Sequence, residues 1–359
     1  LAWAQGAYQF DRYQNKEDVG NGIAKLCLPA TVDPAVIKGA IKGGFLARDL
    51  INTPASDMGP EELASAAVEL AKEFDGTWEV TVSDDLLTAN YPAIHAVGRA
   101  SAQAPRLIDL RWGPEDGRRL TLVGKGVCFD TGGLNLKGTA GMAKMKKDMG
   151  GAATVLGLAA MIMSAEWPIR LRVLIPAVEN AVSGNAYRPG DILSTRKGLT
   201  VEVGNTDAEG RIVLCDALAE ADSEKPELII DMATLTGAAR VALGTDLPAV
   251  FTGSDEIAEA LNSAGEKPDD PVWRLPLHGP YRALLKSKVA DLNNVSDGAF
   301  GGAITAALYL QSFIEDSSRW VHIDTYSWND KDRPGRPAGG DGLAMRALFA
   351  MLSDRFGQS

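Results

Sequence analysis

The chain has 359 residues, of which 45% are hydrophobic, 23% charged and 6% aromatic, and this length suits one large α/β domain or two smaller ones. Such a composition is typical of a globular protein and excludes a mainly disordered chain. Because 36 lysines and arginines face 47 aspartates and glutamates, the net charge of −11 provides no overall basic field, and nucleic-acid binding is not expected.

The first part of the chain indicates where the main domain and its first helices begin and end. Residues 1–32 are expected to be a linker or the end of a preceding domain, since the chain begins without Met and without a signal-peptide pattern. The apolar pattern of residues 33–52 fits one face of a helix. Pro60 then opens a second helix, and Asp75-Gly76 closes it before the strand-like segment 78–83.

Further along, β-rich runs alternate with helical patterns. The β-rich runs lie at 106–112, 120–129, 171–178, 199–205, 227–234 and 320–326, and the helical patterns at 151–165, 211–222 and 304–316. Nearly continuous apolar strands separated by helices predict an α/β fold, with a mostly parallel central sheet flanked by helices on both faces. In such folds the working site lies beyond the carboxyl ends of the strands.

Some features are expected to be purely structural. Cys27, Cys128 and Cys215 are widely spaced in apolar runs, which indicates reduced core residues of a cytoplasmic protein. No apolar stretch reaches the length of a membrane span. The three histidines are expected to be structural, the basic run of Lys144, Lys146 and Lys147 to be a solvated face, and residues 333–342 to be a mobile surface loop or the lead into a helix.

Two polar segments leave apolar strands and lead towards helices: residues 124–151 and residues 205–211. They do not form a phosphate-binding loop, because Arg119 and Gly126 replace the Gly and the Ser or Thr that it needs. Phe129 replaces the last glycine of a dinucleotide fingerprint. A GxSxG elbow and an HExxH zinc motif are absent from the sequence.

The two segments instead carry many oxygen ligands and cations: Asp130, Asp148, Asp207 and Glu209, with Lys125, Lys137 and Arg211. Four carboxylates in one pocket repel one another unless cations neutralise them, and two divalent ions would supply four positive charges. This balance requires Lys125 to be a neutral amine ligand, and it leaves Lys137 and Arg211 to bind an anion. In the alternative, the acidic residues cap helices and the lysines are solvated; the residues alone leave both interpretations open.

The motifs themselves resemble those of the leucyl aminopeptidase (cytosol aminopeptidase) family, peptidase family M17. The matching segments, in the family's order, are VGKGVCFDTGGLNLK (123–137), MKKDMGGAA (145–153), NTDAEGR (205–211), DMATLTGA (231–238), DLNN (291–294) and GGAITAALYL (301–310). The resemblance covers residues 33–359. It implies that this range is a catalytic dinuclear metallopeptidase domain and that the family's N-terminal domain is largely absent.

The resemblance also implies roles for particular residues. One metal site would comprise Asp130, Asp207 and Glu209, and the second Lys125, Asp130, Asp148 and Glu209. Lys137 and Arg211 match the family's catalytic cations. The positions that match the substrate site are Met145, Asn205, Thr234, Leu235 and Gly237.

The implied activity is that of a cytoplasmic, homohexameric aminopeptidase that removes Leu or another bulky apolar residue from short peptides with a free N-terminus. Its cofactors would be two divalent metal ions per subunit, Mn²⁺ or Zn²⁺, with bicarbonate held by Arg211 as the general base. The alternatives are a DNA-binding accessory protein and a non-catalytic scaffold on the same fold. HIDTYSWND (322–330) departs from the commoner HIDxAGTAW, so the shape of the substrate pocket is open.

Overall fold

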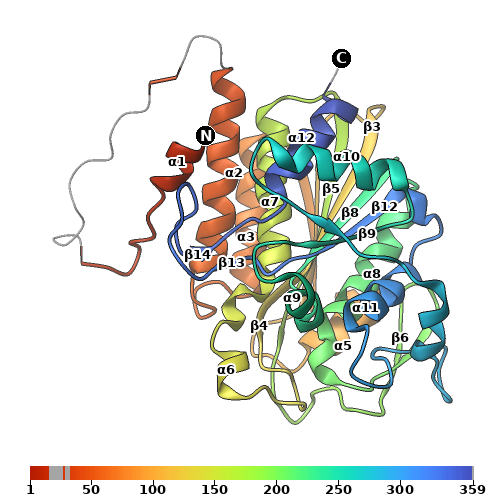
Figure 1. The fold of residues 1–359 in the computed structure, drawn as a ribbon. Helices are drawn as coiled ribbons and strands as arrows, with labels where there is room; N and C mark the ends of the chain where they lie inside the picture. Colours follow the sequence, from red (N-terminus) through yellow and green to blue (C-terminus); the bar gives the residue numbers. More distant parts are fainter. Residues whose placement is uncertain (16–26, 29–32, 358–359) are drawn as a thin grey trace.

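The computed structural model describes residues 1–15, 27–28 and 33–357 (Figure 1). A short helix, α1 (Ala2–Gly6), contacts α2 (Pro34–Asn52) through Gln5, whose side chain donates a hydrogen bond to the carbonyl oxygen of Ala40. Most of the segment between these helices lies outside the described residues, so the expected boundary at residue 33 remains a prediction. None of the described helices is long and apolar enough to cross a membrane.

A nine-stranded sheet forms the centre of the molecule. Its order is β1-β2-β5-β3-β8-β12-β9-β10, and β4 continues beyond β3 along the same neighbour, β5. The strands β5, β3, β8 and β12 are mutually parallel. Three pairs are antiparallel: β1 with β2, β2 with β5, and β9 with β12. The strands are β1 (Thr77–Val82), β2 (Arg106–Trp112), β3 (Arg118–Gly124), β4 (Gly126–Asp130), β5 (Ile169–Asn180), β8 (Leu228–Ala233), β9 (Ala249–Thr252), β10 (Trp273–Arg274) and β12 (Trp320–Asp324).

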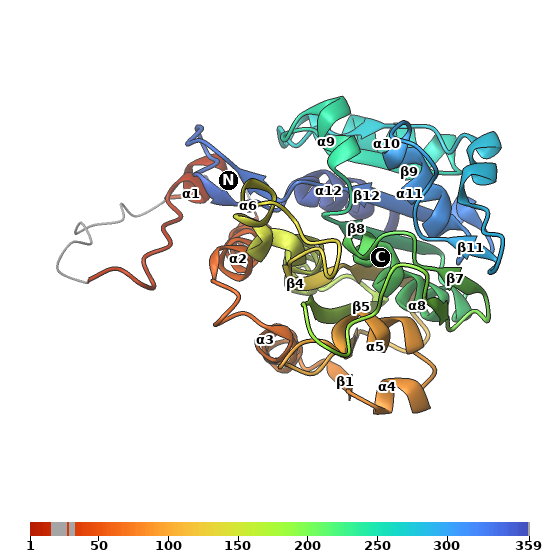
Figure 2. The same cartoon turned by 90° about the horizontal axis from the view of Figure 1, so that it is seen from below.

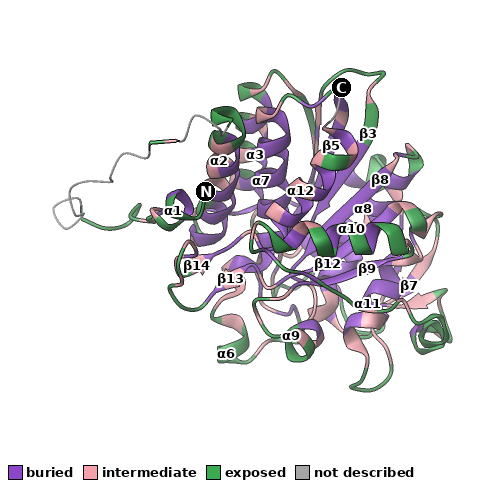
Figure 3. Cartoon of the chain, turned by 45° about the horizontal axis from the view of Figure 1, so that its top comes forward, coloured by how far each residue is buried: buried purple, intermediate pink, exposed green. Residues whose placement is uncertain are grey.

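Helices cover both faces of this sheet (Figures 1 and 2), which confirms the predicted α/β fold. One face packs against α2, α3 (Pro60–Glu73), α7 (Gly150–Ser164), α10 (Asp255–Glu266) and α12 (Met345–Phe356). The opposite face packs against α5 (Pro92–Gly98), α8 (Glu209–Ser223) and α11 (Gly302–Gln311). The central strands β5, β8 and β12 between the two helix layers are buried almost throughout (Figure 3).

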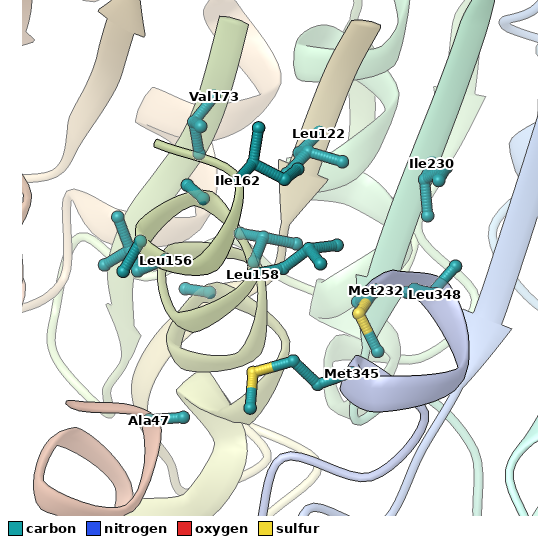
Figure 4. Packing of buried hydrophobic residues seen from close by; sticks show 14 of the residues in the cluster. Ala47, Leu122, Leu156, Leu158, Ile162, Val173, Ile230, Met232, Met345 and Leu348 are labelled. Carbon is teal, nitrogen blue, oxygen red and sulfur yellow. The ribbon is translucent and has the colours of Figure 1, made fainter. Parts of the chain in front are cut away.

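The side chains of each central strand alternate between the two cores. On β8, Ile230 and Met232 belong to the core that contains α7, whereas Ile229 belongs to the core that contains α8. Figure 4 shows Leu122 beside Ile162 of α7, and Ile230 on β8 belongs to the same core cluster. A strand with apolar residues on both faces is buried on both sides, and this is why these strands are continuous apolar runs in the sequence.

The expected strand at 199–205 does not belong to the central sheet. Only β7 (Thr200–Glu202) is a strand, and it pairs with β6 (Ile192–Ser194) and β11 (Leu292–Asn293) in a separate small sheet. Polar residues flank its single buried valine, Val201, so this strand suits a partly exposed sheet better than the doubly covered centre.

Two further local predictions hold only in part. Cys27 is exposed, because it precedes α2 and lies outside the packed layers, whereas Cys128 and Cys215 are buried as expected. The segment 333–342 leads into α12, as one of the two predicted alternatives has it, but it is not a free surface loop, because the buried Arg336 forms ion pairs with Asp270 and Asp341. A short pairing between β13 (Trp328–Asn329) and β14 (Gly339–Gly340) closes this segment.

Candidate active site and metal centre

The two polar segments meet at the carboxyl end of the central strands. Lys125 occupies the break between β3 and β4, where its N–H donates to the carbonyl oxygen of Met232 on β8 (3.0 Å). Asp130 ends β4, Glu209 begins α8, and the 3₁₀ helix η2 (Met145–Met149) carries Asp148. Figure 1 shows β4, α6 (Thr139–Met142) and α9 (Gly237–Leu243) at this one end of the molecule.

A cavity of about 550 Å³ opens at this end. Ten of the twelve sequence-predicted site residues line it: Lys125, Asp130, Lys137, Met145, Asp148, Asp207, Glu209, Thr234, Leu235 and Gly237. The other two, Asn205 and Arg211, lie outside its wall. Residues from motifs that are separate in the sequence therefore line one cavity.

The first predicted metal site has the geometry of a shared cation site. Carboxylate oxygens of Asp130, Asp207 and Glu209 all lie within 4.8 Å of one another. Asp130 is oriented through its Oδ1, which accepts hydrogen bonds from the Gly132 N–H and from Asn180 Nδ2, both at 2.8 Å. Among the described residues, Glu209 Oε2 is buried without a hydrogen-bond partner. An unpartnered buried carboxylate oxygen at this point fits a ligand to a cation.

Lys125 lies at the second predicted metal site. Its Nζ is 2.7 Å from Asp148 Oδ2, 2.9 Å from Glu209 Oε1 and 2.9 Å from the carbonyl oxygen of Thr234. A Cβ on residue 210 would lie 2.6 Å from the Cε of Lys125, so a side chain at this position would displace the lysine from its contacts. Burial opposes the charged lysine, but Asp148 and Glu209 outweigh burial and raise its pKa.

Lys137 contacts the other side of the cluster. Its Nζ is 2.8 Å from Asp130 Oδ2 and 2.5 Å from Asp207 Oδ1. The lysine is carried by a tight loop after β4 in which Gly132 has φ 87°, a left-handed conformation that suits glycine. Its pKa is raised, because the attraction of Asp130 and Asp207 exceeds the opposing effect of burial.

Burial and mutual repulsion disfavour the ionised form of two carboxylates in the cluster, Glu209 and Asp130. Burial and the neighbouring carboxylate of Asp130 raise the pKa of Glu209, and burial with the charge of Asp148 raises the pKa of Asp130. Asp148 itself is buried, yet the adjacent Lys125 lowers its pKa. Additional positive charge would relieve this repulsion, so the residues present fit divalent metal ions.

Asn205 and Arg211 stabilise the loop that carries Asp207. Asn205 Oδ1 accepts a hydrogen bond from the Asp207 N–H (2.8 Å), and Arg211 Nη1 donates to the carbonyl oxygen of Asn294 (2.7 Å). Asn294 is fully buried, and its side chain bonds to Gly204 N and to the Asn205 backbone. The sequence alone indicates no role for Asn294, although the DLNN motif contains it.

The cavity wall also contains residues that the sequence did not indicate, among them Lys147, Arg240 and Tyr326. The expectation that residues 144–147 form a solvated face is wrong for Lys147, which is only 4% exposed because the turn of η2 directs it inward beside Tyr326. The departure at HIDTYSWND was the available signal, since Tyr326 belongs to it.

Comparison with known proteins decides the family. The model of the "Cytosol aminopeptidase family, catalytic domain" matches residues 45–349. The chain belongs to the cytosol aminopeptidase family. This match contains all the predicted metal-ligating and catalytic positions, from Lys125 to Arg211.

Individual members of the family are similar over most of the chain. A probable cytosol aminopeptidase of Rhodopirellula baltica is 46% identical over 310 residues, which are 86% of this chain and 61% of that protein. Peptidase B of an Enterobacter species is 44% identical, covering 85% of this chain and 74% of its own length. The chain therefore spans only part of these curated relatives.

Two solved structures superimpose closely on the chain. The crystal structure of the cytosol aminopeptidase from Coxiella burnetii has a TM-score of 0.94 and 54% identity, covering 98% of this chain and 76% of that one. The bottromycin maturation enzyme BotP, solved in complex with Mn, has a TM-score of 0.87 and 35% identity, covering 99% and 78%. The fold described above is thus the fold of this family.

Proposed function

We propose that the chain is a metal-dependent aminopeptidase that hydrolyses the N-terminal peptide bond of short peptides. The observation that carries this proposal is the grouping of Asp130, Asp207 and Glu209 within 4.8 Å at the wall of a 550 Å³ cavity. Membership of the cytosol aminopeptidase family supports the same reaction. Met145 and Leu235 give the cavity an apolar portion, which fits Leu and other bulky apolar N-terminal residues.

The ligand set fits two divalent metal ions. Asp130, Asp207 and Glu209 would hold one ion, and Lys125, Asp130, Asp148 and Glu209 the other. The Mn complex of BotP supports Mn²⁺, and Zn²⁺ accepts the same ligands. The ions would supply a bound water of lowered pKa and polarisation of the scissile carbonyl. Lys125 must give up its proton to serve as a ligand, since metal ligands bind in their deprotonated form.

Lys137 would stabilise the negative charge that develops on the carbonyl oxygen. Its ammonium is held in the cavity wall by Asp130 and Asp207, so it is oriented before substrate arrives. A donor in this role contributes about 3 kcal/mol to the transition state. Arg211 would hold bicarbonate, which would supply a general base. The buried Nε of Arg211 has no hydrogen-bond partner among the described residues, which fits binding of an anion.

We further propose that residues 33–359 form the catalytic domain and that the protein assembles as a homohexamer in the cytoplasm. We expect it to have no nucleic-acid partner. The net charge of −11 weighs against a DNA-binding accessory role. A non-catalytic scaffold would have no use for buried carboxylates that repel one another, because such groups destabilise a fold unless a cation compensates them.

The test is hydrolysis of leucine p-nitroanilide by metal-stripped protein, before and after addition of Mn²⁺ or Zn²⁺. We expect the metal to restore cleavage of this substrate and not of N-acetyl-leucine p-nitroanilide, which lacks a free amine. Metal bound in full without cleavage of any free-amine substrate would contradict the catalytic proposal. Absence of metal binding would contradict the assignment of the carboxylate cluster.

A further inference from the structure

Three buried side chains form a hydrogen-bonded chain across the central sheet, on the face that packs against α8 and α11. Asp231 on β8 lies opposite His322 on β12 in the register of the two parallel strands, and Asp231 Oδ1 is 2.6 Å from His322 Nδ1. Asp231 Oδ2 accepts a hydrogen bond from Trp320 Nε1 at 2.7 Å. All three side chains are fully buried. The function proposed above uses none of them.

The imidazole of His322 is packed between two aromatic rings. Its centre lies 5.8 Å from that of Phe251 on β9 and 6.1 Å from that of Trp320, with interplanar angles of 25° and 14°. The two rings restrict the plane of the imidazole, so that its Nδ1 is held towards Asp231.

A second carboxylate follows His322 on the same strand. Asp324 is two residues further along β12, so its side chain is on the same face as the imidazole, roughly 6–7 Å further along the strand. Asp324 is buried, and no basic side chain of the described residues forms an ion pair with it. The imidazole is therefore placed between two buried carboxylates, Asp231 and Asp324.

Among the described residues, the titratable groups packed around the imidazole are Asp231 on β8, Asp324 on β12, Arg211 and Cys215 on α8, and Tyr309 on α11; β9 contains none. Burial raises the pKa of the thiol and of the phenol, so both are neutral. Burial lowers the pKa of the imidazole, but the charge and hydrogen bond of Asp231 and the charge of Asp324 outweigh it and raise this pKa. Two carboxylates then face two cations, the imidazolium and the guanidinium, and the buried region has no net charge.

Asp324 connects the imidazole to the cavity wall. Its Oδ1 accepts hydrogen bonds from the N–H groups of Leu235 and Thr236 at 3.1 and 3.2 Å, and its Oδ2 accepts one from the Thr236 hydroxyl at 2.5 Å. The same hydroxyl accepts from the N–H of Ala239 at 3.0 Å and caps α9, which begins at Gly237. An ionised carboxylate accepts on both oxygens, whereas protonation would turn one of them into a donor. Burial raises the pKa of Asp324, and the charge of the imidazolium opposes this rise.

We propose that His322 is a positioning residue of the active site: as an imidazolium between Asp231 and Asp324, it keeps Asp324 ionised and so holds residues 235–237 in the cavity wall. The first and last of these residues are substrate positions proposed above, so the inference rests on the proposed aminopeptidase function. His322 is not part of the cavity wall itself, and it acts through Asp324.

The charge of His322 is tested in the parent protein by nuclear magnetic resonance of isotope-labelled histidine. The chain has three histidines, so the signals are few, and the signal missing from His322→Gln belongs to His322. We expect protons on both ring nitrogens at about pH 7.5, where a free imidazole with a pKa of about 6.5 mostly carries one. A ring with one proton at this pH would overturn the inference. If His322→Gln does not fold, His95→Gln and His278→Gln assign the signal by exclusion.

The positioning role is tested by kcat and KM of the metal-loaded protein with leucine p-nitroanilide. His322→Gln and Asp324→Asn should each raise KM at least about fivefold and change kcat less than about twofold, because substrate contacts shift while the metal ligands remain. The double variant should have a KM within about twofold of Asp324→Asn, because the histidine acts through this carboxylate. A KM that rises by the product of the two single effects would assign His322 an independent structural role and overturn the inference, as would an unchanged KM in His322→Gln.

His95→Gln is the matched control. It removes an imidazole that is also paired with an aspartate, since His95 Nε2 lies 3.1 Å from Asp84 Oδ1, but His95 does not line the cavity. Its kcat and KM should stay within about twofold of the parent values.

Hydrogen exchange separates this inference from the proposed function, because it needs no turnover. Two amides of residues 234–239 donate to Asp324, so this segment should exchange at least about threefold faster in Asp324→Asn and His322→Gln than in the parent or His95→Gln. Faster exchange without cleavage of any free-amine substrate would count against the aminopeptidase alone. Parent-like exchange in both variants would overturn the inference. If His322→Gln does not fold, Asp324→Asn decides: its imidazole should lose the second proton at a lower pH than in the parent, and an unchanged titration would refute the coupling.

Discussion

Lys125 Nζ lies 2.7 Å from Asp148 Oδ2, and each side chain is at most 4% exposed. The pair joins the break between β3 and β4 to the 3₁₀ helix η2, so it links the two parts of the first polar segment. Because it is buried beside Glu209, the lysine balances negative charge that a metal ion would otherwise balance. The same contacts therefore define both a structural ion pair and a set of metal ligands.

Removal of one carboxylate from the cluster should reduce metal binding. Asp207→Asn and Asp148→Asn each lose an anionic ligand, so we expect metal-stripped and reloaded protein to hold less than the full complement of Mn²⁺. Metal content measured by inductively coupled plasma mass spectrometry tests this. Asp116→Asn, an exposed position, is the control and should retain the parent's metal content. Full occupancy in both cluster variants would refute the ligand assignment.

Removal of Lys137 should affect turnover more than metal binding. Lys137→Ala deletes the ammonium in the cavity wall but none of the carboxylates, so metal content should persist. The loss of one stabilising donor corresponds to about 10²–10³ in kcat. Steady-state kinetics with leucine p-nitroanilide, alongside the metal content, measures both quantities. A kcat equal to that of the parent would remove Lys137 from the mechanism.

The predicted elements and metal ligands depend on local sequence. Lys125 and Asp130 stand within one strand-loop segment, and Asp207 and Glu209 within another, so the order of motifs and the convergence of parallel strand ends place them together. The alternating burial of β8 follows in the same way from its apolar run. These features need no knowledge of distant contacts.

The positions of Lys147, Arg240 and Tyr326 at the cavity could not be predicted in this manner. Lys147, Arg240 and Tyr326 come from three separate segments, and Lys147 is part of a basic run that suits a solvated face equally well. Its burial is decided by how η2 packs against the residues after β12, which is a tertiary property. The departure at HIDTYSWND marked the region as unusual, but it did not indicate which cations would lie against the tyrosine.

Asn294 should stabilise the loop that carries Asp207. Its buried side chain accepts from the N–H groups of Gly204 and Asn205 and donates to the carbonyl oxygen of Asn205. Asn294→Ala leaves these backbone groups unpaired, so we expect a loss of about 1–3 kcal/mol in the free energy of unfolding, together with weaker Mn²⁺ binding. Urea denaturation and a metal titration measure the two effects. Asn293→Ala, whose side chain accepts one bond from Val295 N, should cost less; an equal or greater cost would contradict the argument.

Asp216 should make stability fall as the pH rises. Burial raises its pKa to about 7, although its carboxylate accepts hydrogen bonds from the N–H groups of Ala93, Ile94 and Arg196. An aspartate in the unfolded chain has a pKa of about 3.9. Between about pH 4 and pH 7 the folded state therefore retains a proton that the unfolded state has lost. This contribution to the free energy of unfolding is complete below about pH 4 and is lost as the pH rises through about 7. Asp216→Asn has no such group, and urea denaturation at about pH 5 and pH 8 should show a smaller decline than in the parent. An identical decline in both proteins would assign the pH dependence to other groups.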